Sequence, residues 1–240
     1  MEGHIILRTL VGSRAHGLAN PSSSDYDYRG VYITPTSELL KVDAGAYKGS
    51  HWLEGKDDDT SYEIAHFLHL AMKSNPSILE VMVAPVVEST PIGSELRKLF
   101  PYVWSSRGVY DAFNGYSTNQ RIKMLSDNEQ YVKRKWKYAC AHIRVLLMGI
   151  QLLDTGKMSL DTQTYGDVDK YIPTSYSGSW IDYLRGIKMS SDFFASVGEI
   201  IDVTEELKRR LKVFFDNNPS KESNVDIINN FLLQVRKDNW

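Results

Sequence analysis

Two short strand patterns and a glycine turn constrain the fold of this chain more than any other feature. Ile5–Val11 is a continuous apolar run that ends at Gly12, and Tyr26–Ile33 alternates aromatic or apolar residues with polar ones. Such runs are typical of a buried and a half-buried strand, and a glycine directly after a strand permits a tight turn. Asn20–Ser24 supplies turn-forming residues between the two patterns. We therefore expect the N-terminal part of the chain to be α/β.

Further elements are predicted up to about residue 83. His51–Leu53 and Thr60–Ile64 have the composition of two more strands that pair with each other. Ala65–Lys73 has helical spacing and ends before Asn75-Pro76. The segment after Asn75 fits both a strand and a helix, and Pro76 would suit the first position of a short helix.

The second half of the chain has a different pattern, because long amphipathic stretches replace the short strands after residue 105. These stretches predict a helical region at residues 106–240 behind an α/β domain at residues 1–105. The predicted helices cover residues 110–125, 131–153, 190–215 and 225–235, and a loop is expected at residues 165–180.

Composition narrows the class of protein. The 240 residues are 42% hydrophobic, which is enough for a sizeable core, and the formal net charge of −2 does not favour nucleic acid as an obligatory partner. Cys140 is the single cysteine, so the chain forms no internal disulfide and no cysteine-rich zinc site. The apolar runs are shorter than the ~18 residues of a membrane span. We expect a soluble, cytoplasmic protein with no membrane partner.

The Gly12-Ser13 turn and the Asp25-Tyr26-Asp27 segment are the candidates for chemistry. A glycine lets the backbone approach a ligand closely, and the Ser13 hydroxyl and nearby N–H groups suit a phosphate. Asp25 and Asp27 project to one face if both lie on a strand, where two negative charges repel unless a cation lies between them. Mg²⁺ prefers such oxygen ligands and shares them with substrate phosphates. The alternative without a catalytic role is a polar turn with solvated carboxylates.

These residues resemble a known family. Gly12-Ser13 with Ser24-Asp25-Tyr26-Asp27 is similar to the signature of the DNA polymerase β nucleotidyltransferase superfamily. The longer segments Gly12–Gly17 and Asp25–Tyr32 resemble its predicted-nucleotidyltransferase branch, the RNA-repair-pathway polymerase β family. The resemblance covers roughly residues 5–160, and further matching segments are Tyr62–Ile64, Asn75–Glu80, Phe113–Tyr116 and Lys137–Arg144.

The resemblance implies a fold and an activity. The expected fold is an α+β nucleotidyltransferase, with a mixed sheet and flanking helices followed by a helical C-terminal region. The expected enzyme uses Mg²⁺ or Mn²⁺ to move a nucleotidyl group from a nucleoside triphosphate to an acceptor hydroxyl or phosphate, with RNA as a candidate acceptor. A catalytically inactive nucleotide-binding or antitoxin-like module is the alternative, although retention of Asp25 and Asp27 disfavours it. A phosphohydrolase of another fold is disfavoured by the Gly-Ser element.

A third carboxylate is expected from a neighbouring strand, as a metal ligand or as the base that activates the acceptor. We favour Glu63, because it lies inside the strand pattern at Thr60–Ile64. Asp58 and Asp59, in an acidic run that also contains Asp57, remain alternatives.

Other polar residues are candidates for a functional or a structural role. Arg14, in the turn after Ser13, suits the triphosphate or nucleobase, and a surface loop is the alternative. Arg29 shares a strand face with Asp27 and would neutralise phosphate charge or form a structural ion pair. His142 is a candidate nucleotide contact or a buried helical histidine. Glu80 is expected to be structural.

Overall fold

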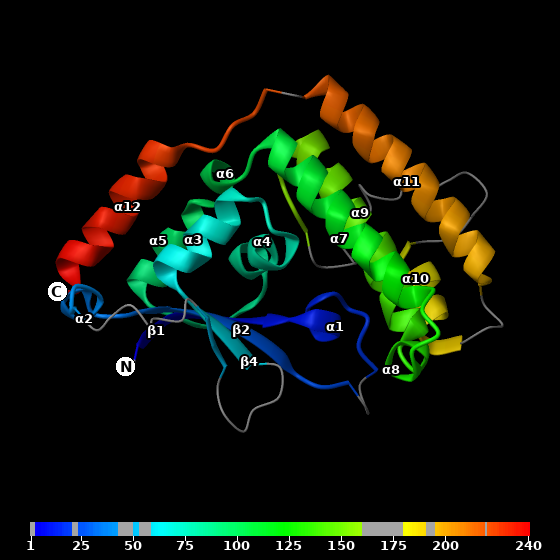
Figure 1. Ribbon diagram of the computed structural model, residues 1–240, viewed down its shortest axis with the longest axis horizontal. Helices are drawn as coiled ribbons and strands as arrows, with labels where there is room; N and C mark the ends of the chain where they lie inside the picture. The colour runs from blue at the N-terminus through cyan, green and yellow to red at the C-terminus, as the bar shows by residue number, and fades with distance from the viewer. Residues whose placement is uncertain are drawn as a thin grey trace. The chain divides into compact units, whose positions relative to one another are not determined.

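A mixed sheet forms from the predicted strands. In the computed structural model, β1 (His4–Val11) pairs antiparallel with β2 (Asp27–Ile33), which in turn pairs parallel with β4 (Asp59–Glu63). β3 (Ser50–Trp52) and β5 (Val86–Ser89) form the edges, giving the order β3-β4-β2-β1-β5 (Figure 1). The predicted α+β nucleotidyltransferase-like fold is confirmed.

The chain divides into two units, each described here by itself. The first comprises Met1–Ser105 with Glu222–Trp240, and the second comprises Ser106–Lys221. The expected helical region at residues 106–240 is therefore corrected at its C-terminal end, because residues 222–240 pack with the sheet-containing unit. The structure describes residues 3–20, 24–42, 50–52, 59–159, 180–190, 195–218 and 220–240.

Helices cover one side of the sheet in the first unit (Figure 1). α4 (Pro76–Val83) is the short helix that Pro76 suggested, and Asn75 begins it by accepting hydrogen bonds from the N–H groups of Ser77 and Ile78 at 3.0 and 3.3 Å. Side-chain caps of this kind satisfy N–H groups that a helix leaves without partners. The other helices of this unit are α1 (Gly12–Ala15), α2 (Thr36–Leu39), α3 (Ile64–Met72), α5 (Pro91–Lys98), α6 (Phe100–Val103) and α12 (Val225–Asp238).

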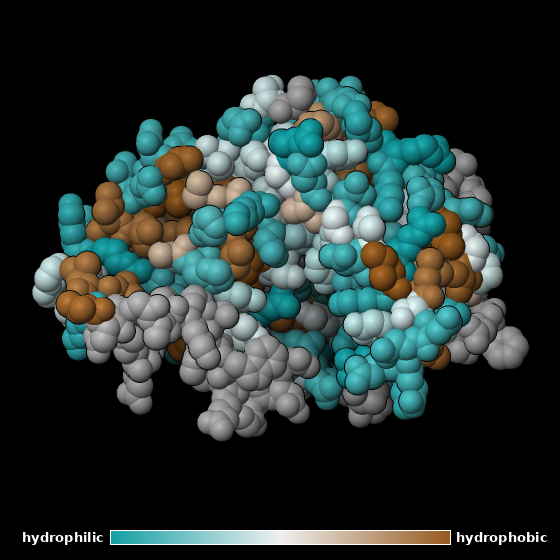
Figure 2. Space-filling view, in the orientation of Figure 1, coloured by the Kyte–Doolittle hydropathy of each residue, from teal (hydrophilic) through white to brown (hydrophobic). Residues whose placement is uncertain are grey.

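The last helix, α12, places one side against α3 and α6. Ile228 and Val235 are buried on that side, whereas Leu233 is 57% exposed. Figure 2 shows hydrophobic residues along α12 on the face in view. The amphipathic pattern thus explains why this segment packs with the sheet-containing unit.

The second unit is helical. α7 (Ser106–Met124), α9 (Lys135–Thr155) and α11 (Val197–Asn217) run alongside one another (Figure 1), and α9 is the most buried of them. The helix predicted at residues 131–153 is split, because α8 (Glu129–Val132) ends before α9 begins.

The third predicted helix, at residues 190–215, is also corrected. Ser190 instead ends α10 (Trp180–Ser190), and α11 begins at Val197 after Ser196, which forms a capping box with Glu199. The loop expected at residues 165–180 lies outside the described residues except for its last position, which begins α10.

Candidate active site

Gly12 and Asp27 lie against each other where β1 ends and β2 begins. Val11 is the partner of Asp27 across the two strands, and Gly12 follows with a φ of +70°. A Cβ atom added to Gly12 would lie 2.0 Å from Oδ2 of Asp27. The backbone of the turn is therefore in contact with a carboxylate of the Asp25-Tyr26-Asp27 segment, called the DxD segment below. The Gly12-Ser13 turn and the DxD segment thus lie together in space.

The Glu80 side chain binds this turn. Its Oε1 accepts a hydrogen bond from the N–H of Gly12 at 3.3 Å and lies 3.0 Å from Nε2 of His16. His16 is fully buried and Glu80 is nearly so. Because a buried carboxylate is costly without partners, both contacts stabilise the turn in its observed form.

Sequence reasoning missed the pairing of Glu80 with His16. A signal existed, since Glu80 is the only charged residue in the otherwise apolar run Ile78–Val83. A lone acid on a buried helix requires a polar partner, but nothing in the sequence indicates that this partner is the glycine turn.

Asp25 precedes β2 and is exposed, whereas Asp27 is half-buried at its first position. The chain before them is held by Ser24, whose N–H donates to the carbonyl of Asn20 at 3.0 Å. In return, Oγ of Ser24 accepts from the N–H of Asn20 at 2.8 Å. The residue directly before the aspartates is thus bonded twice to Asn20.

Arg14 is also bonded to Ser24. Its Nε and Nη2 both donate to the carbonyl oxygen of Ser24, at 3.1 and 2.7 Å, and its guanidinium lies 3.8 Å from the centre of the Tyr26 ring. The Arg14 guanidinium, which was expected to contact a phosphate, instead contacts Ser24 and Tyr26. Ser13 is half-buried, and its carbonyl accepts from the N–H of Leu18 at 2.9 Å.

Arg29 lies two residues after Asp27 on β2 and therefore on the same strand face. Its Nη1 donates to the carbonyl oxygen of Ser77 at 3.2 Å, in the first turn of α4. Among the described residues this contact is to a backbone carbonyl oxygen rather than to a carboxylate.

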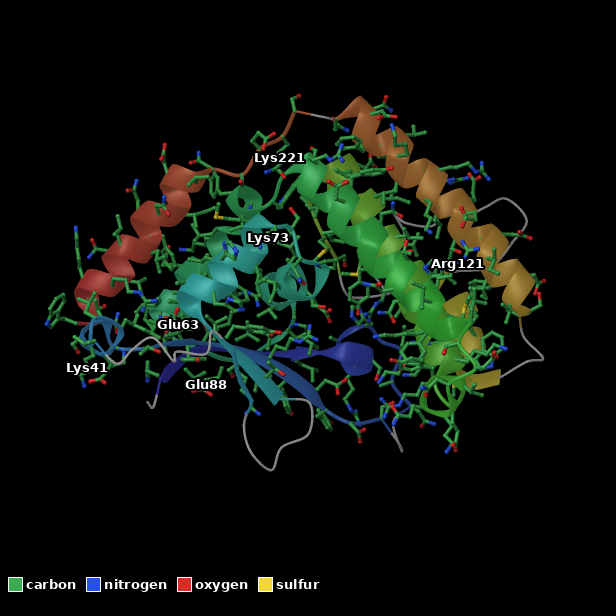
Figure 3. The ribbon with its side chains drawn as sticks, in the orientation of Figure 1. Lys41, Glu63, Lys73, Glu88, Arg121 and Lys221 are labelled. Atoms are coloured by element: carbon green, nitrogen blue, oxygen red, sulfur yellow. The ribbon has the colours of Figure 1, made fainter. Side chains whose placement is uncertain are left out.

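Glu63 does not join Asp27. The parallel register pairs Glu63 with Tyr32, five residues along β2 from Asp27 and so about 16 Å away. Figure 3 labels Glu63 at the junction of β4 and α3, at the other end of the sheet from α1. Its Oε2 accepts from the N–H of Ala65 at 2.7 Å, and its Oε1 accepts from Nη2 of Arg236 at 2.6 Å. The favoured third acid is therefore a helix cap and a buried ion-pair partner.

The alternative acids lie at the start of β4 and directly before it. The backbone of Asp59 pairs with Tyr28, next to Asp27, so this strand does enter the sheet beside the DxD segment. Asp57 and Asp58 lie outside the described residues. Within the ranges that the structure describes, no three His, Cys, Asp or Glu side chains form a metal-binding group.

His142 lies in α9 of the second unit and is fully buried. Its Nδ1 shares a hydrogen bond of 2.6 Å with Oγ of Ser117, and Nε2 has no hydrogen-bond partner among the described residues. Burial lowers the pKa of the imidazole to about 4, with smaller contributions from the charges of Lys208 and Arg121. The ring is neutral at physiological pH and is buried, and its expected contact with the nucleotide stays a prediction.

Comparison with protein-family models gives a match over nearly the whole chain. A family model described as the RNA repair pathway DNA polymerase beta family matches residues 2–234. The chain belongs to this family. The resemblance noted in the sequence is thereby confirmed, and the match spans both units of the structure.

A curated protein is similar to this chain over most of the length of both proteins. It is an uncharacterized protein, MJ0002, of Methanocaldococcus jannaschii. The two are 24% identical over 213 residues, which is 88% of this chain and 79% of the archaeal protein. No helix in the described parts of the chain has the length and apolar character needed to cross a membrane.

Proposed function

We propose that this protein is a nucleotidyltransferase that moves a nucleoside monophosphate from a nucleoside triphosphate to an acceptor hydroxyl or phosphate. The observation that carries the proposal is the contact between the Gly12 turn and the Asp27 carboxylate. It joins a phosphate-binding element to a metal-binding element, and nucleotidyl transfer requires both.

The donor set fits a hard divalent cation such as Mg²⁺ or Mn²⁺. Asp25 and Asp27 supply carboxylate oxygens, and the exposed position of Asp25 leaves its carboxylate accessible to solvent. When bound, the cation would neutralise charge on the phosphates and orient them for in-line attack. We assign the third carboxylate to the acidic run Asp57–Asp59, because β4 begins beside the start of β2.

The residues of the turn take separate roles. The N–H of Gly12 is already bonded to Glu80, so we assign phosphate binding to Ser13 and to the charge of Arg29. Arg14 fixes the loop that carries Asp25 through its bonds to Ser24. The family description favours RNA as the acceptor.

The direct test uses each nucleoside triphosphate labelled at the α-phosphate, with Mg²⁺ or Mn²⁺ and total RNA. We expect label transfer and pyrophosphate release. Asp27→Asn should reduce both by at least about 100-fold, whereas Asp226→Asn, at an exposed position of α12, should leave both unchanged. Nucleotide binding without transfer or pyrophosphate release would instead favour a catalytically inactive binding module.

A further inference from the structure

Two tyrosines alternate with the aspartates of the candidate site. The rings of Tyr26 and Tyr28 are nearly parallel, with centres 6.3 Å apart and planes inclined by 14°. Tyr26 is 56% exposed and Tyr28 is half-buried. Because successive side chains of a strand point to opposite faces, Tyr28 lies on the face of β2 opposite to Asp27.

Two arginines complete this aromatic pair. The guanidinium of Arg8 lies 4.3 Å from the centre of the Tyr28 ring, and that of Arg14 lies 3.8 Å from the centre of the Tyr26 ring. Arg14 is also held by its two hydrogen bonds to the carbonyl of Ser24. Four planar groups are therefore held together before any ligand arrives, and two of them carry positive charge.

An exposed aromatic ring beside fixed cations suits a ligand that is both planar and negatively charged. An unpaired nucleotide has these properties, because its base stacks on aromatic rings and guanidinium planes while its phosphates meet the positive charge. A base within a duplex is covered on both faces by its neighbours and cannot use the ring in this way. An acidic peptide would match the positive charge but has no planar base to stack on the ring.

We propose that the Arg8–Tyr28–Tyr26–Arg14 stack is a binding surface for unpaired bases of single-stranded RNA. The proposal rests on the proposed function, since it names the form of acceptor that the Asp25 and Asp27 site would receive. Tyr26 lies between the two aspartates in the sequence, directly before β2, whereas Tyr28 lies on the face of β2 opposite to Asp27. The surface thus favours unpaired nucleotides over paired ones.

The test measures RNA binding without catalysis. A fluorescent single-stranded RNA of about 12 nucleotides is titrated with the full chain, in EDTA and without nucleoside triphosphate, and anisotropy gives the Kd. We expect Tyr26→Ala to weaken binding by about 5- to 100-fold. Tyr26→Phe keeps the ring and should bind as the wild type does.

Tyr102→Ala is the matched control, because Tyr102 is a 41% exposed tyrosine on α6 of the same unit. It should leave the Kd unchanged, and duplex RNA of the same sequence should compete poorly. The proposal is overturned if the wild type does not bind the strand, if Tyr26→Ala binds as well as wild type, or if duplex competes equally. Binding that depends on Tyr26 in a protein that releases no pyrophosphate would refute the proposed function and leave this surface standing.

Discussion

A methyl group on Gly12 would occupy the same space as the carboxylate of Asp27, because its carbon would lie 2.0 Å from Oδ2. Gly12 also has a φ of +70°, in the left-handed region that side chains other than glycine rarely adopt. Two independent constraints therefore require glycine at this position. One belongs to the backbone of the turn, and the other belongs to the aspartate that faces it.

Gly12→Ala separates these constraints when it is compared with Gly156→Ala. Gly156 also has a φ of +70°, at the end of α9, but a Cβ added there meets no atom within 4 Å. We expect Gly156→Ala to cost about 1 kcal/mol of unfolding free energy and to leave nucleotidyl transfer intact. Gly12→Ala should abolish transfer, because Asp27 must move. Equal activities of the two variants in the pyrophosphate assay would show that the contact with Asp27 is not needed.

Glu80 provides a second test of the turn. Glu80→Ala leaves the N–H of Gly12 and the buried Nε2 of His16 without their shared acceptor, at a cost of about 1–3 kcal/mol for each group. Glu80→Gln keeps an oxygen at that position and should retain most of the stability and activity. Urea unfolding and the KM for nucleotide measure both effects. If the glutamine variant is as impaired as the alanine variant, the negative charge rather than the acceptor oxygen is what the turn requires.

Glu63 is expected to act on stability. Glu63→Gln keeps an oxygen to cap α3 but removes the charge that faces Arg236, so the unfolding free energy should fall by at least about 2 kcal/mol. Below its unfolding temperature the variant should keep a kcat near that of the wild type. The control is Glu88→Gln, at an exposed position on β5, which should change neither quantity. If Glu63→Gln lost nucleotidyl transfer and kept the unfolding free energy of the wild type, Glu63 would be an active-site residue after all.

The pH dependence of stability should reveal His142. Its folded pKa is about 4 against an ordinary value of 6.5, so between these values the unfolded chain binds a proton that the folded chain does not. The unfolding free energy therefore falls as pH falls through this window, by about 3 kcal/mol from this group. His142→Asn should have a shallower fall between about pH 7 and pH 4, measured by urea unfolding. Identical slopes would mean that His142 is not the group responsible.

Cys140 should be unreactive in the folded protein. The thiol is buried, its Sγ donates to the carbonyl of Leu184 at 3.4 Å, and burial raises its pKa to about 12. At mildly alkaline pH the thiolate fraction is then about 1000-fold lower than for a thiol with its ordinary pKa of 9.0. A thiol reagent should label this single cysteine only after urea is added. Rapid labelling of the native protein would show that the second unit opens around α9.

Local patterns predicted much of this fold. The apolar run at Ile5–Val11 and the alternation at Tyr26–Ile33 each produced the expected strand, because each depends on nearby residues alone. The segment after Asn75, which fitted both a strand and a helix, forms a helix. β5 was not anticipated, because Val86 and Val87 are both about half exposed and show no alternation between a buried and an exposed face. Pairing with β1 makes this segment a strand.

The sequence did not predict the parts of the site that depend on contacts between distant residues. The spacing of Glu63 from the DxD segment fits a third acid, and only the parallel register with β2 reveals that it pairs with Tyr32 instead. Arg14 similarly meets the carbonyl of Ser24, which depends on how the intervening loop closes. Strand register and loop closure are tertiary properties, and a single sequence specifies them weakly.

The ion pair between Glu63 and Arg236 has a consequence for the order in which the protein matures. Arg236 also donates to the carbonyl of Thr34, and the N–H of Thr36 donates to the carbonyl of Asn239 at 2.7 Å. The first unit thus contains a piece of chain that the ribosome makes after the whole of the second unit. During translation Ser106–Lys221 can pack as soon as it emerges, because its partners are contiguous. Because α12 is made last, its bonds to Thr34, Thr36 and Glu63 can form only after the second unit has been translated.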